Sequence, residues 1–348
     1  MKKYISWRWR VAYIALIGLV LQIVHRNCIS VALICMTESN SGILQKINES
    51  ELNISKTLVN DLLQIEEQYR IDWDSITQGL VLSSYFYGQI ISPLISGFVC
   101  RKFGVRWPMS IYTLISSVSL MLIPVASEVN VTVVIVLRII QGFLGSGCLP
   151  MFAHLWTQWT PVHERSQLIS FTFSGLDLGV IIAFASSGWL CSIPVHNGWP
   201  FIFYTFGAVS FLWMILWCVF VTDTPKCHAW ISEKEKQYII GDNIESNLTT
   251  DNSKKDTVPW ISILTSGPVW AMATAMFTVA WGMTVVFSYL PRYMNDVLDF
   301  DIHKNGLMSS LPFAGKTISV IVIGVLTDKL IKSRILNITH IRKINQCT

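Results

Sequence analysis

Long apolar segments alternate with polar ones along most of the chain. An apolar helix of about 20 residues, with a rise of about 1.5 Å per residue, crosses the ~30 Å hydrocarbon core of a bilayer. The first segment carries no cleavage pattern of a signal peptide, so we interpret it as a retained helix. The pattern predicts eight membrane-spanning helices, at residues 11–36, 76–100, 107–126, 131–153, 168–190, 201–221, 268–290 and 307–326. The expected fold class is therefore an all-α membrane protein.

The polar loops between these segments predict the orientation of the chain. Basic residues gather in the N-terminal MKKYISWRWR, in RKFGVRW after the second helix and in DKLIKSR after the eighth. Because positively charged loops stay in the cytoplasm, we expect the N-terminus, the linker at 222–266 and the C-terminal tail on that side. The long acidic loop at 37–75 then faces the lumen or the outside. We expect N-glycans on its two sequons, at Asn48 and Asn53.

Composition supports a membrane protein and excludes several other classes. The 348 residues are 52% hydrophobic and 14% charged, with a mean hydropathy of +0.48. The net charge of +4 is scattered over short loops, so we expect the lipid bilayer and not nucleic acid as a partner. Of the eight cysteines, only Cys191 falls in a predicted external loop, and neither a disulfide framework nor a metal site is expected. No nucleophile–base arrangement or phosphate loop indicates an enzyme, and no cofactor is expected beyond a coupling ion, H⁺ or Na⁺.

The order of helices and loops predicts three regions. These are an N-terminal half of six helices at residues 1–221, a cytoplasmic linker at 222–266, and the first two helices of a second half at 267–348. Weak internal similarity favours two related halves, because GFVCRK ends the second helix and GVLTDK ends the eighth. A second half of six helices would give twelve. We therefore expect an incomplete fold, with eight of twelve helices, and we expect that this chain alone does not transport.

Two arginines interrupt the apolar segments, Arg26 in the first and Arg138 in the fourth. A charge within hydrocarbon is costly, and its usual reason is an anion, a carboxylate partner or a water-filled path. Counted from the outer ends of their helices, Arg26 lies about 15 Å deep and Arg138 about 10 Å deep. The planar guanidinium suits a carboxylate or phosphate, but each arginine could instead bind a carbonyl or carboxylate and hold helices together. Small residues that allow close helix contact follow Arg138, at Gly142, Gly145, Ser146 and Gly147.

Three further polar residues lie within the predicted spans. Asp177, near the middle of the fifth helix, is either a proton site, the partner of an arginine, or a residue packed against a polar neighbour. Lys316, in the eighth helix, either adds positive charge to an anion path or pairs with Asp177. His154, at the end of the fourth helix, is a candidate for ion coupling, although a lone helical histidine is more often a satisfied polar residue.

Five stretches spread over nearly the whole chain carry a family resemblance. They read GLVLSSYFYGQIISPLISGF, RIIQGFLGSGCLP followed by HLWTQWTPVHERS, GWPFIFYTFG, DTPKCHAWISEKEKQYI and NGLMSSLPFAG. Together they resemble the anion-transporter family that includes sialin, the vesicular glutamate transporters and the type I sodium–phosphate cotransporters. The resemblance implies a major facilitator fold of twelve helices. It also implies secondary active transport of a small organic or inorganic anion, by symport or membrane potential, across a plasma, lysosomal or vesicular membrane.

The resemblance also assigns roles to single residues. Arg26 matches the first-helix arginine that contacts the substrate carboxylate in this family, and Arg138 matches the fourth-helix arginine. The proton-sensing glutamate of the acid-driven members is absent, since Gly145-Ser146 stands at its place, so proton coupling by that route is not expected. Leu82 and Val279 replace a histidine and an arginine of the glutamate transporters, which argues against that branch. The alternative function is a truncated, non-transporting isoform or fragment of such a transporter.

Overall fold

The structure is a computed structural model that describes residues 6–37, 71, 73–161, 164–191, 193, 198–248, 260–298 and 302–333. The regular elements among these residues are all helices, which confirms the predicted class. The elements are α1 (Trp7–Thr37), α4 (Ser75–Gln89), α5 (Ser92–Phe103), α6 (Arg106–Val129), α7 (Val131–Trp159), α8 (Arg165–Phe173), α9 (Gly175–Cys191), α10 (Trp199–Phe220), the 3₁₀ turn η2 (Pro225–Cys227), α11 (Glu233–Leu248), α12 (Trp260–Leu264), α13 (Gly267–Asp296) and α14 (Ile302–Ser333).

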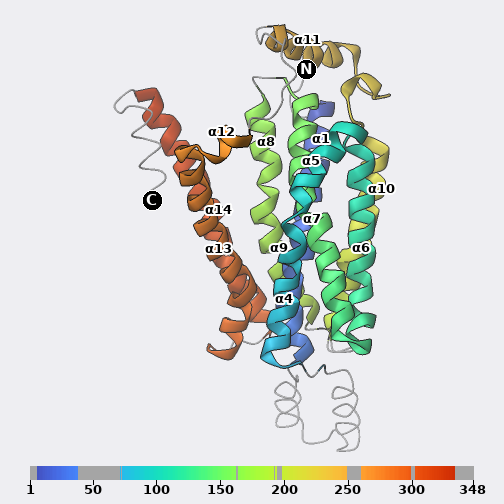
Figure 1. Cartoon of the computed structure of the whole chain (residues 1–348), viewed down its shortest axis with the longest axis vertical. Helices are drawn as coiled ribbons and strands as arrows, with labels where there is room; N and C mark the ends of the chain where they lie inside the picture. The colour runs from blue at the N-terminus through green and yellow to red at the C-terminus, as the bar shows by residue number, and fades with distance from the viewer. Residues whose placement is uncertain are drawn as a thin grey trace, which may run out of the picture.

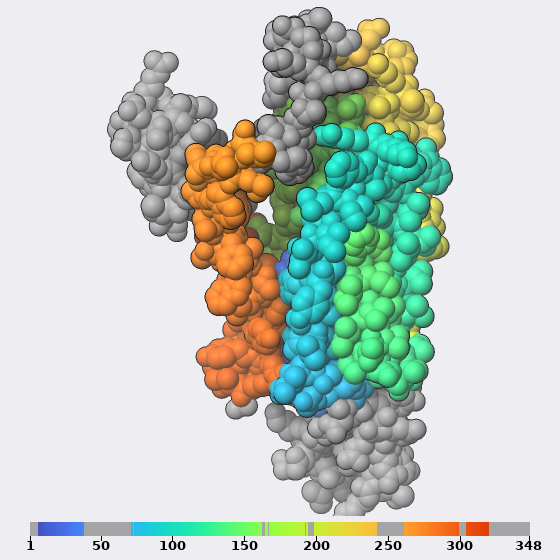
Figure 2. All heavy atoms as spheres, viewed as in Figure 1, coloured from blue at the N-terminus to red at the C-terminus, as the bar shows by residue number. Residues whose placement is uncertain are grey.

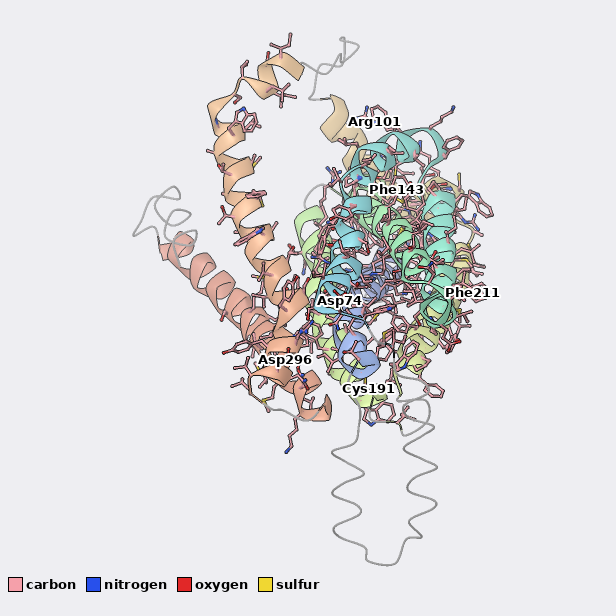
Figure 3. All side chains as sticks on the ribbon, turned by 60° about the horizontal axis from the view of Figure 1, so that its bottom comes forward. Asp74, Arg101, Phe143, Cys191, Phe211 and Asp296 are labelled. Carbon is pink, nitrogen blue, oxygen red and sulfur yellow. A yellow bond between two sulfur atoms is a disulfide. The ribbon has the colours of Figure 1, made fainter. Side chains whose placement is uncertain are left out.

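The long helices run up and down along one axis of the molecule (Figure 1). The first helix, α1, packs against α9 and α10, α4 packs on α7, and α6 packs against both α7 and α10. The last two helices, α13 and α14, contact α1 and α9 and lean away from the rest towards the end where α11 lies (Figure 1). We name this end the α11 end. We name the opposite end the disulfide end, after the disulfide between Cys35 and Cys191. Asp74, Cys191 and Asp296 lie at this end, and Arg101 lies at the α11 end (Figure 3).

Six stretches of the described residues are long and apolar enough to cross a membrane. They are Trp7–Thr37, Arg106–Val129, Val131–Trp159, Gln167–Cys191, Trp199–Phe220 and Gly267–Asp296. Five of them contain a predicted span, and Trp199–Phe220 ends one residue before the predicted end at 221, so these six predictions are confirmed in position. The other two predicted spans fall on the pair α4 and α5 and on α14. The helices extend beyond the apolar runs because polar residues such as Arg8 and Asp296 continue them outside the hydrocarbon.

The predicted second span is broken into α4 and α5 at Ile90 and Ile91. Pro93 causes the break, because proline has no N–H to donate to the carbonyl four residues earlier, at Gln89. The hydroxyl of Ser146 on α7 donates to that carbonyl at 3.4 Å. A neighbouring hydroxyl commonly satisfies a carbonyl freed in this way within a membrane. The break therefore sits where α7 can support it.

Glycines let α4 and α7 approach until their backbones touch. A Cβ placed on Gly142 would overlap the carbonyl oxygen of Tyr85, and a Cβ on Gly88 would overlap that of Ile139. One placed on Gly145 would lie 2.5 Å from the Tyr85 hydroxyl. The close contact predicted from the small residues is therefore present. It fixes the position of α4, which forms one wall of the site described below.

We expect Gly88→Ala to destabilise the bundle and Gly79→Ala to leave it unchanged or slightly more stable. Both glycines lie on α4, but the added methyl at Gly88 meets the backbone of α7, whereas nothing lies within 4 Å of a Cβ at Gly79. Overpacking of this kind costs about 1–3 kcal/mol, and alanine favours a helix over glycine by about 1 kcal/mol. Melting curves of the purified variants in detergent measure the difference. Equal melting temperatures would contradict the packing described here.

The expectation of no disulfide is wrong. Cys35, in the last turn of α1, forms a disulfide with Cys191, the last residue of α9, and both are buried. Cys35 looked like part of an apolar span because α1 keeps its apolar residues up to its final turn. Both helices end on the same side, so their terminal cysteines meet. Because disulfides persist in oxidising compartments, the disulfide end is expected to face the lumen or the outside, in agreement with the basic loops at the opposite end.

At the α11 end, α11 is fastened to the start of α1. The carboxylate of Glu235 accepts hydrogen bonds from the backbone N–H groups of Trp7 and Arg8, at 3.1 and 3.2 Å. These are N–H groups that a helix start leaves without partners. The side chain of Arg8 lies 2.9 Å from Glu164 and 3.8 Å from Glu235. Burial lowers the pKa of the nearby His228, whose ring lies 4.5 Å from that of Trp7.

Candidate functional site

Arg26 lies on the wall of a cavity between α1, α4 and α13. The cavity has a volume of about 500 Å³, and Figure 2 shows the hollow between α13, in orange, and α4 with α5, in cyan. Most of its lining is apolar and aromatic, and Arg26 is its one charged residue. The lining residues are Arg26, Phe86, Gln89, Ile90, Phe277, Ala280, Trp281, Met283, Thr284 and Phe287.

The Arg26 guanidinium is held between two aromatic rings. Its central carbon lies 5.0 Å from the centre of the Phe86 ring and 5.4 Å from that of Phe287, in the range of cation–π contacts. One nitrogen donates to the hydroxyl of Thr284 at 3.4 Å. Among the described residues, no carboxylate forms an ion pair with it. A half-buried cation is thus presented to the cavity without a countercharge.

Arg138 is directed at the backbone of α1 and does not line this cavity. It is 1% exposed, and it donates to the backbone carbonyls of His25 and Arg26, each at 3.1 Å. A third hydrogen bond reaches the side-chain oxygen of Gln141 at 3.0 Å, and the guanidinium lies 5.0 Å from the Tyr85 ring centre. In this conformation the two arginines do not meet on one anion. Arg138 instead binds the segment of α1 that carries Arg26.

Asp177 and Lys316 form an ion pair between α9 and α14, at 2.7 Å. The side chains are 23% and 39% exposed, respectively. Of the alternatives left open by the sequence, the ion pair is the arrangement present, and the partner of Asp177 is Lys316 and not Arg138. Nearer the disulfide end, Gly306 of α14 packs against the backbone of Phe184 and Gly188 on α9. The ion pair and this close contact both hold α14 on α9.

The remaining candidates lie away from the cavity. His154 is half-buried inside α7, which continues to Trp159, so the prediction that it ends the helix is wrong. The helix continues because Leu155, Trp156 and Trp159 share a buried face that packs in the core at the α11 end. His25, which precedes Arg26 in the sequence, does not line the cavity either, because it is buried and bonded to the hydroxyls of Ser116 and Ser210, at 3.1 and 2.6 Å. Asn48 and Asn53 lie outside the described residues.

Sequence reasoning missed the aromatic lining of the cavity. On α13, the lining residues Phe277, Trp281, Thr284 and Phe287 recur every three or four positions and therefore share one helical face. That spacing was visible in the sequence. It did not stand out because the other faces of α13 are also apolar, as expected for a helix in a membrane.

Comparisons with known proteins identify the family. The model of the Major Facilitator Superfamily matches residues 15–341. The chain belongs to this superfamily. Human sialin is 34% identical over 93% of this chain and 64% of its own length. The probable small intestine urate exporter of mouse is 35% identical over 83% of this chain and 58% of its own length.

These relatives confirm the resemblance to the sialin family, and they are transporters and not enzymes. The chain spans 64% of the length of human sialin. Among solved structures, a bacterial homologue of the lysosomal transporter Spinster, inward-facing and unoccupied, aligns with a TM-score of 0.63 at 13% identity, covering 95% of this chain and 64% of that one. At this identity the likeness concerns the fold alone. This chain is therefore a multi-pass membrane protein of the major facilitator fold.

Proposed function

We propose that this chain forms the anion-binding part of a secondary active transporter for a small organic or inorganic anion. The observation that carries the proposal is Arg26, a cation in a membrane helix that faces a cavity without a carboxylate partner among the described residues. Such a charge is stable at this depth when it meets water or an anion. The similarity to a probable urate exporter supports an anionic cargo.

The surroundings of Arg26 suit an anion that arrives with little water. Phe86 and Phe287 flank the guanidinium, and its nitrogens remain able to donate hydrogen bonds to an anion. Between apolar walls the effective dielectric constant falls, so the attraction between guanidinium and anion increases. Two oxygens of a carboxylate or phosphate match the planar fork, and they replace the weak contact with Thr284 at 3.4 Å.

The shape of the molecule favours loading from the α11 end. There α13 and α14 diverge from the other helices, whereas α13 meets α4 at the disulfide end (Figure 1). The basic loops assign the α11 end to the cytoplasm, so the anion would enter or leave the cavity on the cytoplasmic side. Transport then requires α13 and α14 to rock against the N-terminal helices, so that the cavity opens on the other side.

The Asp177–Lys316 pair is the candidate for ion coupling, because it joins α9 of the first half to α14 of the second. A proton on the carboxylate, or a sodium ion that replaces the lysine beside it, would break the pair and change how firmly the two helices are held. The membrane potential, acting on the anion itself, is the alternative driving force.

Anion-dependent stabilisation of the purified chain tests the proposal. Urate, glutamate and phosphate are each added at rising concentration, at constant ionic strength set with potassium chloride, and the melting temperature is followed. An anion that binds is expected to stabilise the folded chain by about 2.7 kcal/mol at 100 times its Kd. Arg26→Gln should abolish the shift, whereas Arg101→Gln, a control at an exposed arginine at the α11 end, should retain it. No shift with any of the three anions, or an equal shift in Arg26→Gln, would contradict the proposal.

A further inference from the structure

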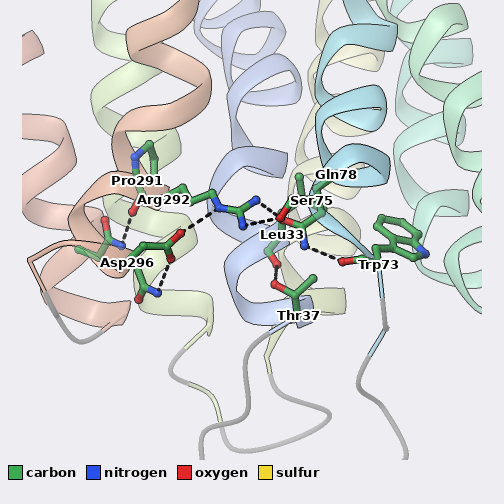
Figure 4. Close-up of polar contacts among 10 residues, drawn as sticks. Leu33, Thr37, Trp73, Ser75, Gln78, Pro291, Arg292 and Asp296 are labelled. Carbon is green, nitrogen blue, oxygen red and sulfur yellow. Dashed lines mark hydrogen bonds and ion pairs between the residues drawn. The ribbon is translucent and has the colours of Figure 1, made fainter.

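A polar cluster joins α4 and α13 at the disulfide end, and Arg292 is its centre (Figure 4). From α13, the Arg292 guanidinium donates to the side-chain oxygen of Gln78 at 2.6 Å and to the hydroxyl of Ser75 at 3.3 Å, both on α4. Its third contact is Asp296, one turn further along α13, at 3.0 Å. One side chain thus bridges a helix of the first half and a helix of the second.

The α4 side of this bridge is held firmly. Gln78 is buried and donates to the backbone carbonyl of Trp73 at 2.8 Å, which fixes the amide so that its oxygen faces Arg292. Asp74 caps the start of α4 by accepting from the N–H of Thr77 at 3.0 Å, and this hydrogen bonding lowers the pKa of Asp74. The cap stays charged at neutral pH and keeps the first turn of α4, with Ser75, in place.

The cluster lies on the same path as the Arg26 cavity. A second, smaller cavity of about 40 Å³ is enclosed by the same three helices. Its lining residues are Ser30, Leu33, Ile34, Thr37, Gln78, Leu82, Ser288, Arg292 and Asp296. Ser30 lies one turn beyond Arg26 on α1, and Ser288 lies one turn beyond Thr284 on α13. The two cavities are therefore neighbours along α1 and α13, and we call the line from Arg26 to Arg292 the track.

Arg292 ends this track on the α13 side. It lies eight residues beyond Thr284, which contacts Arg26, and eight residues of helix span about 12 Å. Around the track the contact between the halves is largely apolar, as where the ring of Phe184 on α9 meets that of Phe313 on α14, with centres 5.7 Å apart. Apolar surfaces separate without breaking directional bonds, whereas Arg292 must release two hydrogen bonds.

We propose that Arg292 is the gate at the disulfide end of the anion path. While it binds Gln78 and Ser75, the track is closed to that side and the Arg26 cavity opens only towards the α11 end. Opening requires the guanidinium to leave α4, and Asp296 on its own helix then keeps it paired. The inference rests on the proposed function only in that an anion travels the track. The bridge itself is a property of the described residues.

Access to the track from the disulfide side tests the gate without any substrate. Ser30→Cys places a thiol in the small cavity, in a background with Cys218→Ser and Cys227→Ser and with the Cys35–Cys191 disulfide retained. A membrane-impermeant maleimide is added to intact cells or sealed vesicles in which the disulfide end faces the reagent. The labelling rate is corrected for the same background with serine at position 30, which accounts for all the remaining thiols.

Arg292→Ala is expected to raise the labelling rate about tenfold or more, since it removes both bonds to α4. Gln78→Leu should raise it as well, because it removes the main acceptor and leaves Arg292 intact. Tyr293→Ala is the matched control: Tyr293 follows Arg292 on α13, is exposed and lines neither cavity, so its loss should leave the rate near that of the parent. Size-exclusion profiles identify any variant that fails to fold.

Unchanged labelling in folded Arg292→Ala and Gln78→Leu would overturn the gate. Faster labelling in all three variants would overturn it too, because it would indicate general loosening of this end. Neither outcome depends on Arg26 binding an anion. Failure of the gate and failure of the proposed function are therefore measured separately.

Discussion

Arg138→Gln is expected to unfold the bundle at a far lower temperature, whereas Arg26→Gln keeps the fold and loses the anion. Arg138 is buried and donates to two carbonyls of α1 and to Gln141. Glutamine is too short to reach all three acceptors, and each hydrogen bond from a charged donor such as Arg138 contributes about 1.5–3 kcal/mol. Arg26 donates one 3.4 Å hydrogen bond and lies between the rings of Phe86 and Phe287, so its loss should cost less stability than the loss of three buried hydrogen bonds.

The effects on anion binding should have the opposite order, with Arg26→Gln weakening binding more than Arg138→Gln does. Loss of the charged contact from Arg26 removes about 1.5–3 kcal/mol, or roughly ten- to a hundredfold in affinity. Lysine at position 26 should restore little of it, because a single ammonium lacks the planar fork. The measurements are melting curves for stability and anion titrations of the variants that fold. A stable Arg138→Gln that has lost binding while Arg26→Gln retains it would reverse the two assignments.

The depth of both arginines could be predicted from the sequence, but not the face on which each lies. Depth follows from counting residues along helices whose length the bilayer sets, and the spans that carry the two arginines had the right positions. The direction of a side chain follows from the rotation of its helix. That rotation is set by close contacts such as Gly142 against Tyr85, which involve residues far apart in the sequence. Arg138 therefore faces the α1 backbone and Arg26 the cavity.

The site itself depends on pairs that no single segment contains. Cys35 and Cys191, Arg292 and Gln78, and Lys316 and Asp177 each join distant parts of the chain. For the last of these the sequence indicated both charges, and the pairing was one of the alternatives. The choice between a lysine and an arginine partner required the packing of α14 on α9.

The Asp177–Lys316 pair should show strong coupling in a double-mutant cycle. Asp177→Asn leaves the lysine without its countercharge, and Lys316→Met leaves the carboxylate without its own, so each single change should destabilise the bundle. The double change removes both charges and should recover much of the loss, with a coupling energy of about 0.5–3 kcal/mol. Arg138→Gln combined with Asp177→Asn serves as the matched control and should be additive, because those side chains are not paired.

The same cycle separates a static pair from a coupling site. If the pair only holds α14 on α9, the exchanged pair Asp177→Lys with Lys316→Asp should restore stability and keep the response to anions at every pH. If it couples an ion, the neutral double variant should fold and still bind an anion through Arg26, yet its anion affinity should lose any dependence on pH or sodium that the parent shows. Additive effects of Asp177→Asn and Lys316→Met would contradict both roles, since side chains 2.7 Å apart and oppositely charged must sense each other's removal.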